Sequence, residues 1–148
     1  IEKSLKDRLY QIAQENNIPS MNGGIYLCIE GPQFSTKAES HLYRSWGATI
    51  IGMTNVPESY LAKEAGMAYA TIAMVTDFDC WKEEHCSVEE IMKVAKQNNI
   101  NVQKIIKQAI PNLIKNPIEF TPENNNAVMT SPEIISYDDS LVLNLLLK

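Results

Sequence analysis

The sequence predicts an α/β fold with a mixed, largely parallel sheet and flanking helices. Two observations support this. Helical and strand-like segments alternate along the first 115 residues, and alternation of this kind is typical of sheets covered by helices. The strand-like segments are also apolar almost throughout, as strands buried on both faces are. Ligands in such sheets bind beyond the carboxyl ends of the strands, which is where candidate functional residues are sought.

Four helices are expected, and local start and stop signals define most of their ends. Thr36 with Glu39, and Ser87 with Glu90, match the capping box that begins a helix. Gly66 is a stop signal. Apolar residues recur at helical spacing in the first segment and in the last. The expected helices cover residues 2–16, 37–46, 55–66 and 87–113, with a possible interruption of the last one at Asn98-Asn99.

Three short apolar runs between these helices predict strands. They cover residues 25–29, 48–51 and 69–75. Residues 116–148 differ from the rest, because the stretch 121–136 is rich in Pro, Asn and Ser and predicts a flexible linker. The apolar segment 141–147 is compatible with a short strand or a docking segment.

Composition excludes several classes of protein. Hydrophobic residues make up 45% and charged residues 21%, which is typical of globular chains. No apolar run approaches the roughly 18 residues of a membrane span. Three cysteines form no disulfide framework and indicate a reducing compartment. The net charge of −5, without a basic cluster, argues against nucleic acid and favours small-molecule or protein partners. Because the first residue is Ile1, we expect a chain that has lost its front or belongs to a longer protein.

The end of the third expected strand has two carboxylates, Asp77 and Asp79. They are compatible with loop residues that cap nearby amides, and equally with acids that hydrogen-bond or protonate a ligand. At the second strand end, Thr54 precedes a helix and could bind an anion or form an ordinary turn. Beyond the first strand, Phe34 is either a core aromatic or a ring that covers a flat ligand.

A metal site is not expected. Cys80, His85 and Cys86 cluster, but their spacing matches no common zinc pattern and a fourth ligand is missing. Cys28 lies within a strand with no His nearby in the sequence, which argues against a cysteine nucleophile.

Taken together, the strand-end segments are more specific than any one of them. Residues 30–40, 51–58, 62–66 and 73–81 keep an order and spacing that resemble the methylthioadenosine phosphorylases of the trimeric purine nucleoside phosphorylase family. The resemblance implies a phosphorylase/hydrolase-like fold. Residues 1–115 match only the carboxyl-terminal half of that domain, so we expect an incomplete sheet. Residues 116–148 are expected to form a polar linker and a short apolar tail.

The resemblance also implies a reaction and a set of site residues. Phosphate would attack the anomeric carbon of 5′-methylthioadenosine, giving adenine and 5-methylthioribose 1-phosphate, with phosphate as co-substrate and no other cofactor. Asp77 and Asp79 would be the catalytic acids at the purine, and Thr54 would contact phosphate. The residues implied on the substrate side are Phe34, Ser35, Ile51, Met53, Thr76, Val88, Ile91 and Met92.

Two positions bear on substrate choice. Relatives that prefer 6-oxopurines have Asn at the position of Asp77 and Glu at that of Ser35, so both residues here suit a 6-aminopurine. Relatives that use ordinary nucleosides place a His near Val88, whereas an apolar Val suits a methylthio group.

Three interpretations therefore stay open. The chain is part of a methylthioadenosine phosphorylase that is inactive alone, a non-catalytic paralogue that binds purines or full-length subunits, or a 6-oxopurine nucleoside phosphorylase. The family implies a homotrimer in purine and methionine salvage, located in the cytoplasm with the nucleus as a second location.

Overall fold

A computed structural model describes residues 1–82 and 86–147, with the backbone alone for residue 125. All four expected helices are present, at nearly the expected bounds, and the α/β fold class is confirmed. The elements in chain order are α1 (Lys3–Glu15), β1 (Tyr26–Cys28), α2 (Lys37–Ser45), β2 (Ile50–Gly52), α3 (Asn55–Glu64), α4 (Val88–Lys115), the 3₁₀ helices η1 (Glu123–Asn126) and η2 (Pro132–Ile134), and α5 (Tyr137–Leu146).

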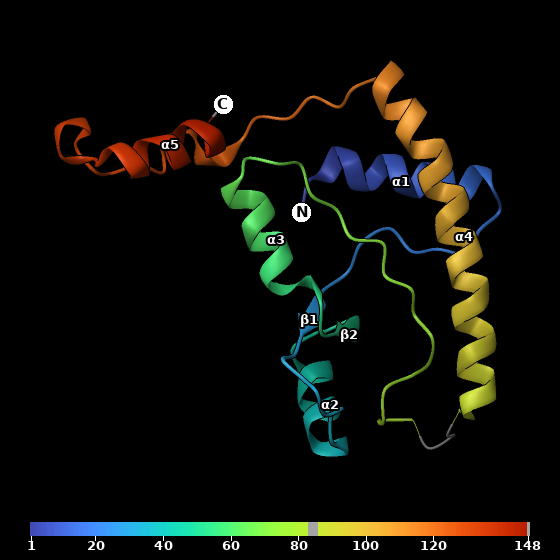
Figure 1. The fold of residues 1–148 in the computed structure, drawn as a ribbon. Helices are drawn as coiled ribbons and strands as arrows, with labels where there is room; N and C mark the ends of the chain where they lie inside the picture. The colour runs from blue at the N-terminus through green and yellow to red at the C-terminus, as the bar shows by residue number, and fades with distance from the viewer. Residues whose placement is uncertain (83–85, 148) are drawn as a thin grey trace.

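The described part of the chain contains one sheet, formed by β1 and β2 (Figure 1). The strands are parallel, with Tyr26 opposite Ile50 and Cys28 opposite Gly52. The ladder extends one step beyond β1, because the Ile29 amide donates to the Gly52 carbonyl at 2.9 Å. Both carboxyl ends therefore leave the sheet at the same edge.

The expectation of a third strand over residues 69–75 is wrong. This segment has no β-ladder within the described residues. The Tyr69 carbonyl accepts from the Glu2 amide, and the Val75 carbonyl accepts from the side chain of Asn98, each at 2.7 Å. An apolar run favours a strand, but the strand forms only where a neighbouring backbone offers a continuous row of partners. In this chain β1 and β2 pair with each other instead.

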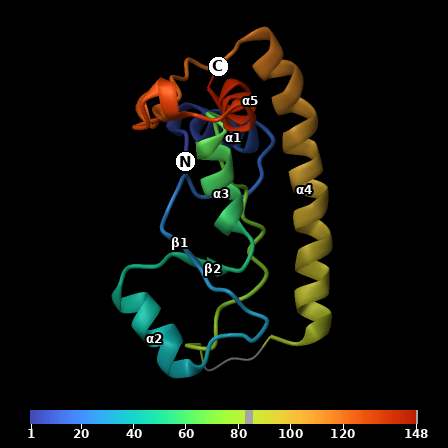
Figure 2. The same ribbon diagram turned by 60° about the vertical axis from the view of Figure 1, so that its left-hand side comes forward.

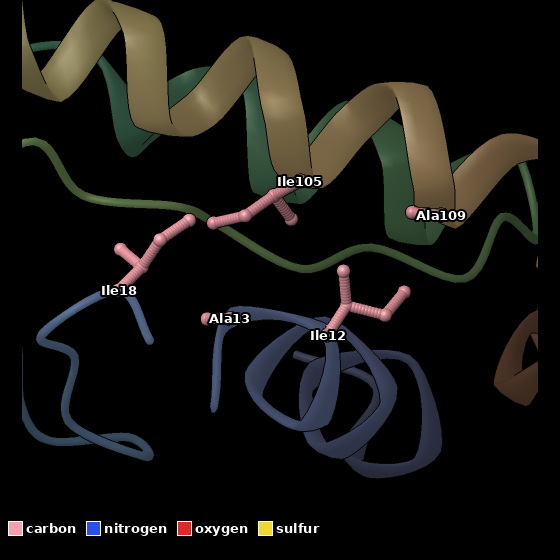
Figure 3. Packing of buried hydrophobic residues seen from close by; sticks show 5 residues of the cluster. All are labelled: Ile12, Ala13, Ile18, Ile105 and Ala109. Atoms are coloured by element: carbon pink, nitrogen blue, oxygen red, sulfur yellow. The ribbon is translucent and has the colours of Figure 1, made fainter. Parts of the chain in front are cut away.

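The core lies between α1 and α4. Its buried residues are Ile12, Ala13, Ile18, Ile105 and Ala109, and Figure 3 shows Ile12 and Ile18 pointing toward α4. Side-chain amides at the rim reinforce the pair of helices: Asn16 and Gln108 exchange two hydrogen bonds of 2.7 and 2.9 Å. These contacts join segments about ninety residues apart, so they fix α4 against the amino-terminal helix.

Helix α4 runs without a break through Asn98 and Asn99, so the expected interruption is wrong. Asn98 has a different role, since its side chain spans the gap to the Val75 carbonyl. In both views the described stretch that follows α3 runs beside α4 (Figures 1 and 2). This hydrogen bond ties the end of that extended stretch to the helix.

Residues 116–147 contain more helical structure than the flexible linker that the sequence predicts. The strand alternative for residues 141–147 is wrong, because Ser136 caps a helix over Tyr137–Leu146 by accepting from the Asp139 amide. Asn124 is buried, and its side-chain amide donates to the Glu64 carbonyl at 2.7 Å and to the Leu146 carbonyl at 3.2 Å. One amide thus holds the ends of α3 and α5 together. Figure 1 shows α5 lying beyond α3, on the side away from α4.

Both predicted capping boxes are present, and they make helix stability depend on pH. Hydrogen bonds from the backbone amide and hydroxyl of Ser87 lower the pKa of Glu90 below its ordinary value of 4.5, and Thr36 lowers the pKa of Glu39 in the same way. A carboxyl group whose pKa is lowered by folding stabilises the folded state at pH values above its unfolded-state pKa. That stability is lost as the pH falls through the folded-state pKa.

We therefore expect Glu90→Ala in a peptide of residues 86–116 to reduce helicity at pH 7 and to flatten its loss on acidification. Circular dichroism at pH values from neutral to strongly acidic measures both effects. Glu89→Ala is the matched control, because it removes the same charge from the same turn but leaves the reciprocal bonds of Ser87 intact. Equal curves for the two variants would contradict the expectation.

Candidate active site

The first two strand-end segments meet at a glycine. Gly31 follows β1 with φ = +74°, and a Cβ built there would lie 2.7 Å from the Met53 sulfur. A side chain at this position would therefore displace Met53, which follows β2. The absence of a Cβ lets the thioether pack against the turn. The segment containing Phe34 and Ser35 thus lies beside the segment containing Met53 and Thr54.

The third segment joins them through two side-chain contacts. The thiol of Cys80 donates to the Ser35 carbonyl, with a sulfur–oxygen distance of 3.2 Å. The guanidinium carbon of Arg44, in the last turn of α2, lies 3.7 Å from the centroid of the Trp81 ring. Residues 76–82, which we call the carboxylate loop, are thereby held against the segment after β1 and the last turn of α2.

Within the carboxylate loop, the two acids differ in exposure. Asp77 is exposed and Asp79 is half-buried. The Thr76 hydroxyl donates to an Asp77 carboxylate oxygen at 2.6 Å, so Thr76 orients this carboxylate. An oriented carboxylate at an open edge can accept a hydrogen bond from an amine or exchange a proton with a ring nitrogen.

Thr54 occupies the position before α3 but does not cap it. Its side chain makes no capping hydrogen bond, and Val56 inside α3 has extended backbone angles (φ −116°, ψ 131°), so the regular helical turns begin after Val56. The neighbouring Asn55 ties the start of this helix to the extended segment: its Oδ1 atom accepts from the Thr71 hydroxyl at 2.6 Å and from the Tyr69 hydroxyl at 3.2 Å. Thr54 is exposed beside a helix start that is fixed in place.

Phe34 is not a core aromatic, because 85% of its surface is exposed. With Ser35 it lines a hollow of about 320 Å³, whose wall also includes Glu30 and Tyr43. Ile51 is the central residue of β2, opposite Leu27, and is half-buried. In the sequence, Ile51 is separated from Met53 by Gly52, the last residue of β2.

Val88, Ile91 and Met92 form one face of the first turns of α4. Val88 and Met92 are 75% and 64% exposed, and Ile91 is half-buried. Figures 1 and 2 place the start of α4 at the same end of the molecule as α2. The structure thus puts these residues at the end of the molecule where α2 lies.

A second hollow, of about 350 Å³, lies elsewhere. It is lined by α1, α4, the segment from Thr71 to Val75 and the turn before β1, and none of the predicted site residues lines it. Its wall is mainly apolar, which offers little chemistry. The convergence of the strand ends, rather than cavity size, therefore identifies the candidate site.

No group of three or more potential metal ligands gathers in residues 1–82 and 86–147. Of the cysteine–histidine cluster considered above, His85 lies outside the described residues, Cys80 is engaged with Ser35, and Cys86 is exposed. Cys28 is half-buried within β1. None of the described helices is both long and apolar enough to cross a membrane.

Two residues at this edge escaped the sequence analysis. Arg44 resembles any surface cation of an amphipathic helix, and nothing in the sequence links it to a ring 37 positions later. Asn55 marks a helix start, but its two hydroxyl donors come from a different segment. Only their distant partners distinguish these side chains from ordinary surface residues.

Comparisons with known proteins agree with this arrangement. Residues 1–111 match the family model described as "Phosphorylase superfamily". The S-methyl-5′-thioadenosine phosphorylase of Rhodospirillum rubrum is 47% identical over 136 residues, which is 87% of this chain and 46% of the relative. The enzyme of the same name from Thermosynechococcus vestitus is 56% identical over 96 residues, covering 64% of this chain and 33% of the relative.

Solved structures extend the likeness to the fold. A methylthioadenosine phosphorylase from an antarctic soil metagenomic library has a TM-score of 0.87 at 39% identity, and covers 98% of this chain and 53% of the solved chain. The Schistosoma mansoni methylthioadenosine phosphorylase in complex with adenine has a TM-score of 0.68 at 35% identity, covering 78% and 46%. The coverage of 98% takes in nearly all of the tail, for which the sequence alone suggested no counterpart.

This chain thus spans about half the length of the curated relatives it matches. The family model covers three quarters of it and includes all three strand-end segments. On these grounds the chain belongs to the phosphorylase superfamily.

Proposed function

We propose that this chain forms the purine and methylthio side of an active site that cleaves 5′-methylthioadenosine with phosphate. The observation that supports this best is that contacts link the segments after β1 and β2 and the carboxylate loop: the Met53 thioether packs at Gly31, and the Cys80 thiol donates to the Ser35 carbonyl. Relatives between 45% and 56% identical have the name of this activity, and a solved relative binds adenine.

The proposed chemistry is displacement at the anomeric carbon. A phosphate oxygen forms a bond to C1′ while the bond from C1′ to purine N9 breaks, and the bonding electron pair leaves with the base. One oxygen of the Asp77 carboxyl group accepts from the 6-amino group, and the other, when protonated, donates its proton to N7, which neutralises the departing purine and leaves Asp77 as a carboxylate. Asp79 supports the same edge, with Thr76 orienting Asp77.

Other residues would hold the substrate in place. Thr54, whose hydroxyl is not used for capping, would contact phosphate. Met53 would pack on the ribose through its polarizable sulfur, and the exposed ring of Phe34 would cover the purine. Ser35 and Ile51 would contact the substrate on its purine and ribose side. The face of α4 with Val88, Ile91 and Met92 would receive the methylthio group, since burial of apolar surface favours it there.

Because the chain spans about half of its relatives, the activity of the whole protein is part of this proposal. Phosphate would be the co-substrate, and no other cofactor is needed. We also propose a homotrimeric assembly, a role in purine and methionine salvage, and a cytoplasmic location. Turnover would require the remaining phosphate-binding residues, which the family resemblance assigns to the other half of the domain.

The test is a chimaera in which this chain replaces the matching region of the Rhodospirillum rubrum relative. We expect phosphate-dependent release of adenine from methylthioadenosine, and little cleavage of inosine. The 148-residue chain alone, measured in parallel, should give no turnover. A chimaera that prefers inosine would support the 6-oxopurine alternative, and a folded chimaera that binds adenine without cleaving either nucleoside would support the non-catalytic one.

A further inference from the structure

We infer that Arg44 and Cys80 are positioning residues that clamp the carboxylate loop onto helix α2 and the turn after β1. This inference rests on the proposed function, because it assigns the loop a task in purine recognition. Arg44 is on α2, and Cys80 and Trp81 are at the far end of the loop. The two contacts made by these residues fix the loop immediately after its acids.

The need for a clamp follows from the backbone. The segment that leads into the loop has no β-ladder in the described residues. Within the loop, a backbone hydrogen bond runs from the Lys82 amide to the Asp79 carbonyl, at 3.2 Å. A carboxylate on such a segment samples many positions unless side chains restrict it, and ordering a residue costs about 1–2 kcal/mol.

The first contact is a cation on an aromatic face. The Arg44 guanidinium lies 3.7 Å from the Trp81 centroid, well within the roughly 6 Å over which such pairs attract. Trp81 is half-buried, and its ring meets Phe78 edge-on at 5.8 Å and 82°. Phe78 and Trp81 flank Asp79 in the sequence, so the stacked side chains restrict the backbone on both sides of this acid.

The second contact is the hydrogen bond from the Cys80 thiol to the Ser35 carbonyl. Ser35 also belongs to the wall of the hollow beside Phe34. The thiol therefore sets the distance between the carboxylates and the segment proposed to cover the purine. Cys80 is half-buried, so its contact is partly shielded from competing water.

If the clamp is correct, a lysine at position 44 should replace the arginine only in part. A planar guanidinium stacks on a ring face, whereas an ammonium is a compact charge that prefers water. We expect Arg44→Met to remove the contact, Arg44→Lys to restore some of it, and Cys80→Ala to release the other side of the loop. Lys37→Met is the matched control, because it removes a cation from the opposite end of the same helix.

The experiment uses the full 148-residue chain at submicromolar concentration with Trp46→Phe, which leaves Trp81 as its one tryptophan. Trp81 emission and its quenching by acrylamide report the position of the loop, and titration with adenine reports purine binding. We expect Arg44→Met to increase quenching and to weaken adenine binding by roughly three- to tenfold, with Arg44→Lys intermediate and Lys37→Met unchanged. Far-UV circular dichroism shows whether each variant keeps its helices.

The outcomes separate the clamp from the proposed function. Unchanged quenching in both Arg44→Met and Cys80→Ala would overturn the clamp, and so would a loss of adenine binding with unchanged quenching. If the parent chain does not bind adenine, the purine role fails, while increased quenching in the two variants with retained helicity would still support the clamp. If Arg44→Met loses its helices, Arg44→Lys and Cys80→Ala decide the matter by the same readouts.

Discussion

Replacing Asp77 by Asn in the chimaera is expected to lower the rate of methylthioadenosine phosphorolysis by roughly 10²–10⁴-fold, the usual contribution of a positioned acid or base. The carboxylate of Asp77 is oriented by the Thr76 hydroxyl at an open edge. An amide cannot deliver a proton to the departing purine, although its oxygen still accepts from the 6-amino group and its NH₂ donates to N7. The substitution therefore weakens the transition state more than it weakens ground-state binding.

The same substitution should change purine preference. An amide offers a donor that a 6-oxopurine can accept, so the ratio of inosine to methylthioadenosine cleavage is expected to rise. Steady-state kinetics with both nucleosides measure the two effects. Asp138→Asn, in the first turn of α5, is the control that makes the same chemical change at a helix start far from the carboxylate loop in sequence. A variant at Asp77 with parental kcat/KM would remove this residue from the proposed mechanism.

The second large effect concerns the chain by itself, which we expect to associate rather than to unfold as a cooperative monomer. Its accessible surface is 11272 Å², whereas a compact monomer of 16.7 kDa exposes about 7,600 Å². Five apolar residues form the buried core of the described chain, while Trp46, Met74 and Ile114 are among many that are more than half exposed. Exposed apolar surface on this scale favours association.

Size-exclusion chromatography and thermal unfolding at increasing concentration test this expectation. The chain should elute above its monomer mass at micromolar concentration and show a broad, shallow transition. The chimaera with the Rhodospirillum rubrum relative is the control, since it should cover the exposed faces and unfold sharply. A monomeric chain with a steep, concentration-independent transition would show that the small core is sufficient.

The candidate site was only partly predictable from sequence. The spacing of the three expected strand ends led to Asp77, Thr54 and Phe34, although only the first two of these segments form strands in the described residues. The roles of these residues stay predictions. Sequence did not reveal Arg44, whose contact with Trp81 joins an ordinary surface position to a loop in another segment. Such a pairing depends on how the chain folds back, which no local pattern encodes.

The sequence by itself determined the helices α2 and α4, and it did so through short-range chemistry. The boxes at Thr36 and Ser87 satisfy backbone amides within one turn, so three or four neighbouring residues are enough to begin α2 and α4. The tertiary structure alone decided that residues 69–75 stay outside the sheet, because a strand is completed by a partner distant in the chain. It likewise decided that Asn98 reaches Val75 without interrupting α4, and that the carboxylate loop rests on side chains of α2 and of the turn after β1.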